Sequence, residues 1–151
     1  MLSVYIIRIN IIFLLILLWL LGCQNFNFNQ EDLQKLKSTK KCPKCNLRNS
    51  SLYKLDLNNA NLTNANLSNS NLSDVNLWKA NLRGADLTNV DLSNANLQYS
   101  NLNYANLKEA DLSRADMAKA KLNSANLDEV ILCHTNMPDG KRSYLHCEGA
   151  N

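Results

Sequence analysis

A large apolar residue recurs every five positions through the middle of this chain. The series runs without a slip from residue 47 to residue 132: Leu47, Leu52, Leu57, Leu62, Leu67, Leu72, Leu77, Leu82, Leu87, Leu92, Leu97, Leu102, Leu107, Leu112, Met117, Leu122, Leu127 and Leu132. A small residue such as Ala60, Ala65 or Ser70 stands two positions before most of them, and Asn or Asp usually comes between. Any fold proposed for the chain has to account for this spacing.

A period of five fits neither a single helix nor a single strand. On an α-helix each five-residue step would turn the leucine by roughly 140°, and on a strand an odd spacing would move it from one face to the other. The pattern is satisfied if each five residues form one side of a coil, with the leucine and the small residue pointing inward. The repeat therefore predicts a solenoid.

Individual units also resemble a known family. The segments 60–64 (ANLTN), 80–84 (ANLRG) and 85–89 (ADLTN) are similar to pentapeptide repeats. The resemblance implies an all-β fold, a right-handed quadrilateral β-helix with four pentapeptides in each coil, for residues 46–132. An interior filled by leucine and alanine leaves no cavity for a small molecule. Function is then expected on the outer faces, the ends or an anchor.

The N-terminus has the pattern of a targeting segment. Arg8 precedes an unbroken apolar run over residues 11–21, which would rise only about 16 Å as a helix, against roughly 30 Å for a hydrocarbon core. We therefore expect a signal peptide over residues 1–22. Leu20-Leu21-Gly22-Cys23 resembles the bacterial lipobox, which implies acylation of Cys23 and an anchor in the cell envelope, on the outer membrane or periplasmic side in a double-membraned organism. An uncleaved apolar helix is the alternative.

Two caps are expected at the ends of the solenoid. Residues 23–45 are expected to form a tether and an N-terminal cap, in which Asn29 followed by Asp32 predicts a short helix to about Ser38. Residues 133–151 are expected to form a C-terminal cap. Within it, residues 133–140 resemble the tail that commonly follows pentapeptide solenoids, with a turn at Pro138-Asp139-Gly140. Both caps would cover core leucines and unpaired backbone groups.

Four cysteines remain once Cys23 is assigned to lipid. Four sides per coil place the two ends of the solenoid roughly 20 Å apart, whereas a disulfide needs Cα atoms within about 7 Å. We therefore expect the pairs Cys42–Cys45 and Cys133–Cys147.

Redox and metal chemistry are the alternatives for these cysteines. A redox CxxC usually starts a helix in a βαβ unit, and the sequence predicts none here. Cys133, His134, His146 and Cys147 offer four metal ligands, but adjacent residues point apart. We expect no metal and no cofactor.

One outer side carries aromatic residues. With twenty residues per coil, Trp78, Lys79, Tyr99 and Lys119 become neighbours, with Tyr104 around the corner. Exposed Trp and Tyr are typical of interfaces, although single aromatic residues on a solenoid are also ordinary. These five residues are the candidate interaction face.

The charged residues and histidines of the repeat region indicate which classes of function to expect. Residues 46–132 contain eight Lys or Arg against nine Asp or Glu, a net charge of −1, and no histidine. We expect no enzyme and no nucleic-acid partner, but a non-catalytic, envelope-anchored interaction or structural module. Its partners would be the membrane, through the lipid or signal anchor, and an unknown protein, with homodimerisation left open. The alternative is suggested by members of the family that mimic DNA and bind topoisomerases, which requires a strongly acidic rod.

Overall fold

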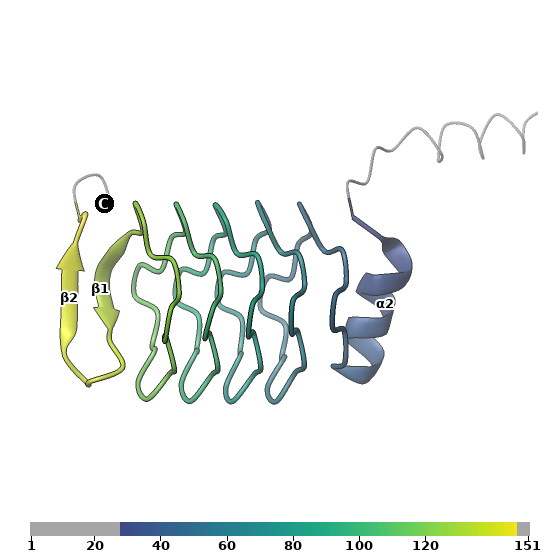
Figure 1. Ribbon diagram of the computed structural model, residues 1–151, viewed down its shortest axis with the longest axis horizontal. Coiled ribbons are helices and arrows are strands. Elements are labelled where there is room, and N and C mark those ends of the chain that lie inside the picture. Colours follow the sequence, from purple (N-terminus) through teal and green to yellow (C-terminus); the bar gives the residue numbers. More distant parts are fainter. Residues whose placement is uncertain (1–27, 148–151) are drawn as a thin grey trace, which may run out of the picture.

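The computed structural model describes residues 28–147 as a stack of coils closed by a different element at each end (Figure 1). Helix α2 (Gln30–Thr39) lies at the N-terminal end, and strands β1 (Leu132–Asn136) and β2 (Arg142–Leu145) form a hairpin at the C-terminal end. The expected signal peptide and Cys23 lie outside the described residues. Within these residues, no helix combines the length and apolar character that a membrane crossing needs.

Each coil contains twenty residues. Parallel bridges join positions twenty apart, as in Asn61 with Asn81 and Asn81 with Asn101. The first bridge starts at Lys41 and the last ends at Asn136, so pairing extends five residues before and four beyond the range 46–132. Twenty residues are four pentapeptides, the number of sides per coil that the family resemblance implied.

Every corner of the coil is a tight turn. In a representative turn, the Ala60 N–H donates to the Leu57 carbonyl at 3.0 Å, and Asn59 has a φ of 55°. A positive φ at the third residue is what a type II turn requires. Tyr99 and Tyr104 adopt the same left-handed conformation, with φ of 57° and 62°. The corners therefore repeat one geometry, and their outward side chains stack from coil to coil.

The core is a column of leucines. The leucines of the five-residue series from Leu47 to Leu112 are at most 2% exposed, and Met117 continues the column with no exposure. At the C-terminal end Leu122 and Leu127 are only partly buried. Because the small residues between the leucines are buried as well, side chains fill the interior.

The N-terminal helix closes the first coil as predicted. The Asn29 side chain caps α2 by accepting hydrogen bonds from the N–H groups of Glu31 at 2.9 Å and Asp32 at 3.4 Å. Leu33 and Leu36 are buried against the solenoid core. The helix ends at Thr39, one residue beyond the predicted end.

The C-terminal hairpin contains the predicted turn. Strands β1 and β2 are antiparallel, with Cys133 opposite Tyr144. The Met137 N–H donates to the Lys141 carbonyl at 2.8 Å, and Gly140 takes a φ of 81°, which favours glycine.

Candidate functional site

The predicted aromatic residues come together on one corner of the solenoid. Trp78 and Lys79 belong to one turn, and Tyr99 and Lys119 occupy the equivalent turns of the next two coils. The Lys79 N–H donates to the Gln98 carbonyl at 2.9 Å, and the Tyr99 N–H donates to the Ala118 carbonyl at 3.0 Å. Trp78, Lys79, Tyr99 and Lys119 are called the aromatic ridge below.

A lysine ammonium lies over each ring of the aromatic ridge. Trp78 and Tyr99 meet edge to face with ring centroids 6.5 Å apart and an interplanar angle of 77°. The Lys79 ammonium lies 4.1 Å from the centroid of the Trp78 ring, and the Lys119 ammonium lies 5.4 Å from that of Tyr99. Tyr99 is 45% exposed. The ridge therefore offers solvent an alternation of apolar ring surface and positive charge.

Tyr104 stands at the next corner, as predicted. The Arg83 guanidinium lies 5.1 Å from the centroid of its ring, and Tyr104 is 58% exposed. Thr63, Asn64, Arg83, Gly84 and Tyr104 line a hollow of about 280 Å³. Sequence reasoning did not single out Arg83. The signal was present, because Arg83 and Tyr104 have the same offset of twenty-one residues as Trp78 and Tyr99.

The structure contains both expected disulfides. Cys42 and Cys45 are bonded with Cα atoms 5.4 Å apart, and Cys133 and Cys147 with Cα atoms 4.7 Å apart. Cys42 is unexposed and Cys45 is 3% exposed, so both point into the solenoid, where Cys42 takes a leucine place.

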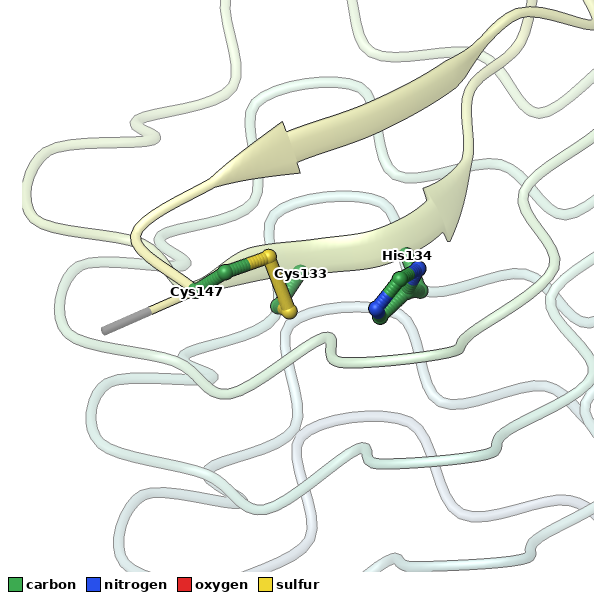
Figure 2. A group of neighbouring side chains, drawn as sticks. All are labelled: Cys133, His134 and Cys147. Carbon is green, nitrogen blue, oxygen red and sulfur yellow. A yellow bond between two sulfur atoms is a disulfide. The ribbon is translucent and has the colours of Figure 1, made fainter. Parts of the chain in front are cut away.

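The His134 ring lies beside the C-terminal disulfide (Figure 2). Ligand atoms of Cys133, His134 and Cys147 lie within 4.8 Å of one another, whereas Nδ1 of His146 is 2.9 Å from the Val130 carbonyl oxygen. With the two sulfurs bonded to each other, neither is the thiolate that a metal site uses. Residues 28–147 contain a second group of this kind, Asp32 with Cys42 and Cys45, and its two sulfurs form the N-terminal disulfide.

The comparison with protein families decides what this architecture is. The sequence profile of pentapeptide repeats (8 copies) matches residues 41–69, 70–103 and 100–137. The chain belongs to the pentapeptide-repeat family. Membership implies that the quadrilateral β-helix is right-handed. Pentapeptide-repeat proteins are in general structural or interaction modules. No curated protein sequence matches the chain significantly.

Several solved structures are similar to this chain. A pentapeptide repeat protein from the thylakoid lumen of Arabidopsis thaliana has 22% identity and a TM-score of 0.52, over 60% of this chain and 66% of its own. One from the cyanobacterium Cyanothece has 27% identity and a TM-score of 0.49, over 72% and 95%. HetL, involved in heterocyst differentiation regulation in the cyanobacterium Nostoc, has 29% identity and a TM-score of 0.42, over 68% and 62%. The first of these likenesses supports the fold alone.

Proposed function

We propose that this pentapeptide-repeat protein is a non-catalytic module, anchored in the cell envelope, that binds a partner protein along one side of its rigid β-helix. The aromatic ridge is the observation that carries this proposal. The few residues that dominate the binding energy of a protein interface are enriched in Trp, Tyr and Arg. Cation–π contacts already order the side chains of the ridge. Binding therefore costs less side-chain conformational entropy than it would on an ordinary surface.

The filled core supports binding on the outside rather than chemistry within. Three hollows among the described residues, of about 220, 280 and 460 Å³, are open to the surface. Carboxylates of the Asp columns are engaged with their own turns. The Asp86 carboxylate accepts hydrogen bonds from the Thr88 N–H at 3.1 Å and from its hydroxyl at 2.6 Å. These Asp side chains therefore have a structural role in the turns.

A capture experiment tests the ridge. The mature protein is used as bait for envelope extract, beside a Trp78→Ala, Tyr99→Ala variant. Tyr53→Ala is the matched control. Tyr53 is 46% exposed, and the Lys54 ammonium lies 4.8 Å from the centroid of its ring, but the pair lies on a different side of the coil. We expect the ridge variant to lose the specific partner and the control to retain it. Equal capture by all three proteins would contradict the proposal.

The anchor is tested separately. If Cys23 is acylated, Cys23→Ser abolishes labelling by radioactive palmitate, while the solenoid still folds because its leucine column starts after the anchor. Gln24 after the cysteine supports the outer membrane, since by resemblance Asp at that place signals retention in the inner membrane. Undiminished label in Cys23→Ser, or no label in the natural chain, would instead support the uncleaved helix.

A further inference from the structure

One side of the solenoid presents cations and amides and, up to its last turn, no carboxylate. Bridges join five outward residues into a single column: Lys41, Asn61, Asn81, Asn101 and Lys121. The aromatic ridge borders this column on one edge, and the turns that contain Lys44, Arg83 and Tyr104 border it on the other. The column with both borders is called the basic face.

The six cations of the basic face are all exposed and free of ion pairs among the described residues: Lys41, Lys44, Lys79, Arg83, Lys119 and Lys121. The described ion pairs involve Lys40, Lys108 and Lys141 instead. Asp139 is the one carboxylate of the described residues in these columns. It lies twenty residues after Lys119, and Lys141 pairs with it at 3.6 Å. Four of the six cations lie within residues 46–132, so the net charge of −1 over that range conceals a positive side, and Lys41 and Lys44 before it add to that side.

The amides of the basic face offer hydrogen-bond donors. The side-chain oxygens of Asn61, Asn81 and Asn101 each accept from a backbone N–H two residues on, at 3.2, 3.2 and 3.1 Å. Their amide nitrogens donate to no group in the described part of the chain. On the neighbouring side, by contrast, the Asn76 amide donates to Asp56 at 2.9 Å. A surface of free donors between cations suits a ligand rich in carboxylate and carbonyl oxygens.

Three of the cations are held in place by the rings beneath them. Lys79 lies over Trp78, Lys119 over Tyr99 and Arg83 over Tyr104. This arrangement leaves the charges ordered before an anion arrives, and a guanidinium can bind a carboxylate through two parallel hydrogen bonds. It also occupies one face of each ring, which disfavours the base stacking that single-stranded nucleic acids use.

We propose, resting on the proposed function, that the basic face binds an acidic, extended segment of the partner protein. Asp and Glu side chains of that segment pair with the six cations, and its carbonyl oxygens accept from the amide column. Charge complementarity selects the partner, and the exposed edges of Trp78 and Tyr99 supply apolar contact. The spacing of about 4.8 Å between coils repeats these groups along a rigid line.

Fluorescence anisotropy with a labelled poly-glutamate peptide tests this proposal on the full processed chain. We expect binding that weakens as salt rises, and an affinity about tenfold lower in Lys79→Glu, Lys119→Glu. The matched control is Lys54→Glu, Arg114→Glu, which reverses two exposed charges on another side of the coil. The control is expected to change affinity less than about twofold.

Three results would overturn the proposal. Equal losses in both double variants would indicate attraction to overall charge rather than to the basic face. If the protein does not bind poly-glutamate, the basic face does not recognise an acidic segment. Preferential binding of duplex DNA or anionic vesicles would assign the face to another class of partner. Capture from envelope extract separates the proposed function from the proposal of an acidic partner. A partner that is lost with Trp78→Ala, Tyr99→Ala but retained by Lys79→Glu, Lys119→Glu would support the proposed function and reject the acidic partner.

Discussion

The Trp78 indole meets the Tyr99 ring edge to face, with centroids 6.5 Å apart, although the two residues lie in successive coils. Their separation of twenty-one is one full coil plus one position within the turn. We predict that this contact couples the two side chains by about 0.5–1.5 kcal/mol beyond their buried area. A double-mutant cycle with Trp78→Ala and Tyr99→Ala, followed by denaturant unfolding, measures the coupling.

The Trp78 and Tyr104 pair provides the control cycle. These residues stand on different corners, so their alanine substitutions should add within about 0.5 kcal/mol. Additive effects for Trp78 and Tyr99 as well would show that the edge-to-face contact contributes nothing in solution.

The C-terminal disulfide is predicted to contribute more stability than the N-terminal one. Cys133 and Cys147 are fourteen residues apart, whereas Cys42 and Cys45 are three apart. In the chain-entropy description a loop of this larger size gives about 3 kcal/mol, and a loop of four residues about 2 kcal/mol. Unfolding of Cys133→Ala, Cys147→Ala and of Cys42→Ala, Cys45→Ala compares the two pairs.

Thiol titration is the independent measurement on the disulfides. Protein purified under oxidising conditions should have no reactive thiol at these four positions before reduction and four after it. Two or more reactive thiols in the native oxidised protein would reject the pairing, whatever the unfolding experiments show.

The fold could be predicted because each local signal agreed with the global one. The leucine period dictated a coil, Asn29 dictated the start of α2, and Pro138-Asp139-Gly140 dictated the hairpin turn. The number of sides in the coil could not come from spacing alone and required the family resemblance. Once twenty residues per coil were assumed, the neighbours on the aromatic ridge followed by arithmetic.

The basic face escaped the sequence analysis because net charge averages over all sides. Lys41, Lys121 and Arg83 lie far apart in the sequence, and only sorting by column brings them together. The free amide nitrogens could not be predicted, because the Asn side-chain oxygen bonds within its own turn in both columns, whereas the amide nitrogen donates between coils at Asn76 and not at Asn81. A side on which six cations stand against one carboxylate also argues against the DNA-mimicry alternative, which requires negative charge around the rod.

Acid is predicted to destabilise the solenoid partly through Asp116. Burial raises the pKa of Asp116, but hydrogen bonds from the Ala118 N–H, Gln98 and Asn136 outweigh it and leave the pKa below its usual value of 3.8. The unfolded chain then binds more protons than the folded one, so this contribution is complete above the unfolded pKa and is lost as pH falls through the folded pKa.

Urea unfolding at neutral pH and at about pH 3 measures this contribution, since the lower pH lies beneath the ordinary Asp pKa. The natural chain should lose more stability between the two conditions than Asp116→Asn, because the amide cannot be protonated there. Asp74→Asn is the control, since Asp74 is exposed and its carboxylate accepts no hydrogen bond within the described part of the chain, although its backbone N–H donates to the Ser93 carbonyl. Identical losses in the natural chain and Asp116→Asn would reject the assignment.

Two buried serines at equivalent inward positions are predicted to respond oppositely to alanine. The Ser70 hydroxyl donates to the Leu47 carbonyl at 2.8 Å, whereas the Ser100 hydroxyl is buried without a partner in the described structure. Ser100→Ala should therefore stabilise the protein by about 1 kcal/mol, because it removes an unpaired polar group where most units carry alanine. Ser70→Ala should cost about 1 kcal/mol, because it leaves the Leu47 carbonyl with one partner fewer. Denaturant unfolding of both variants gives the difference, and a destabilised Ser100→Ala would reveal that an ordered water satisfies that hydroxyl.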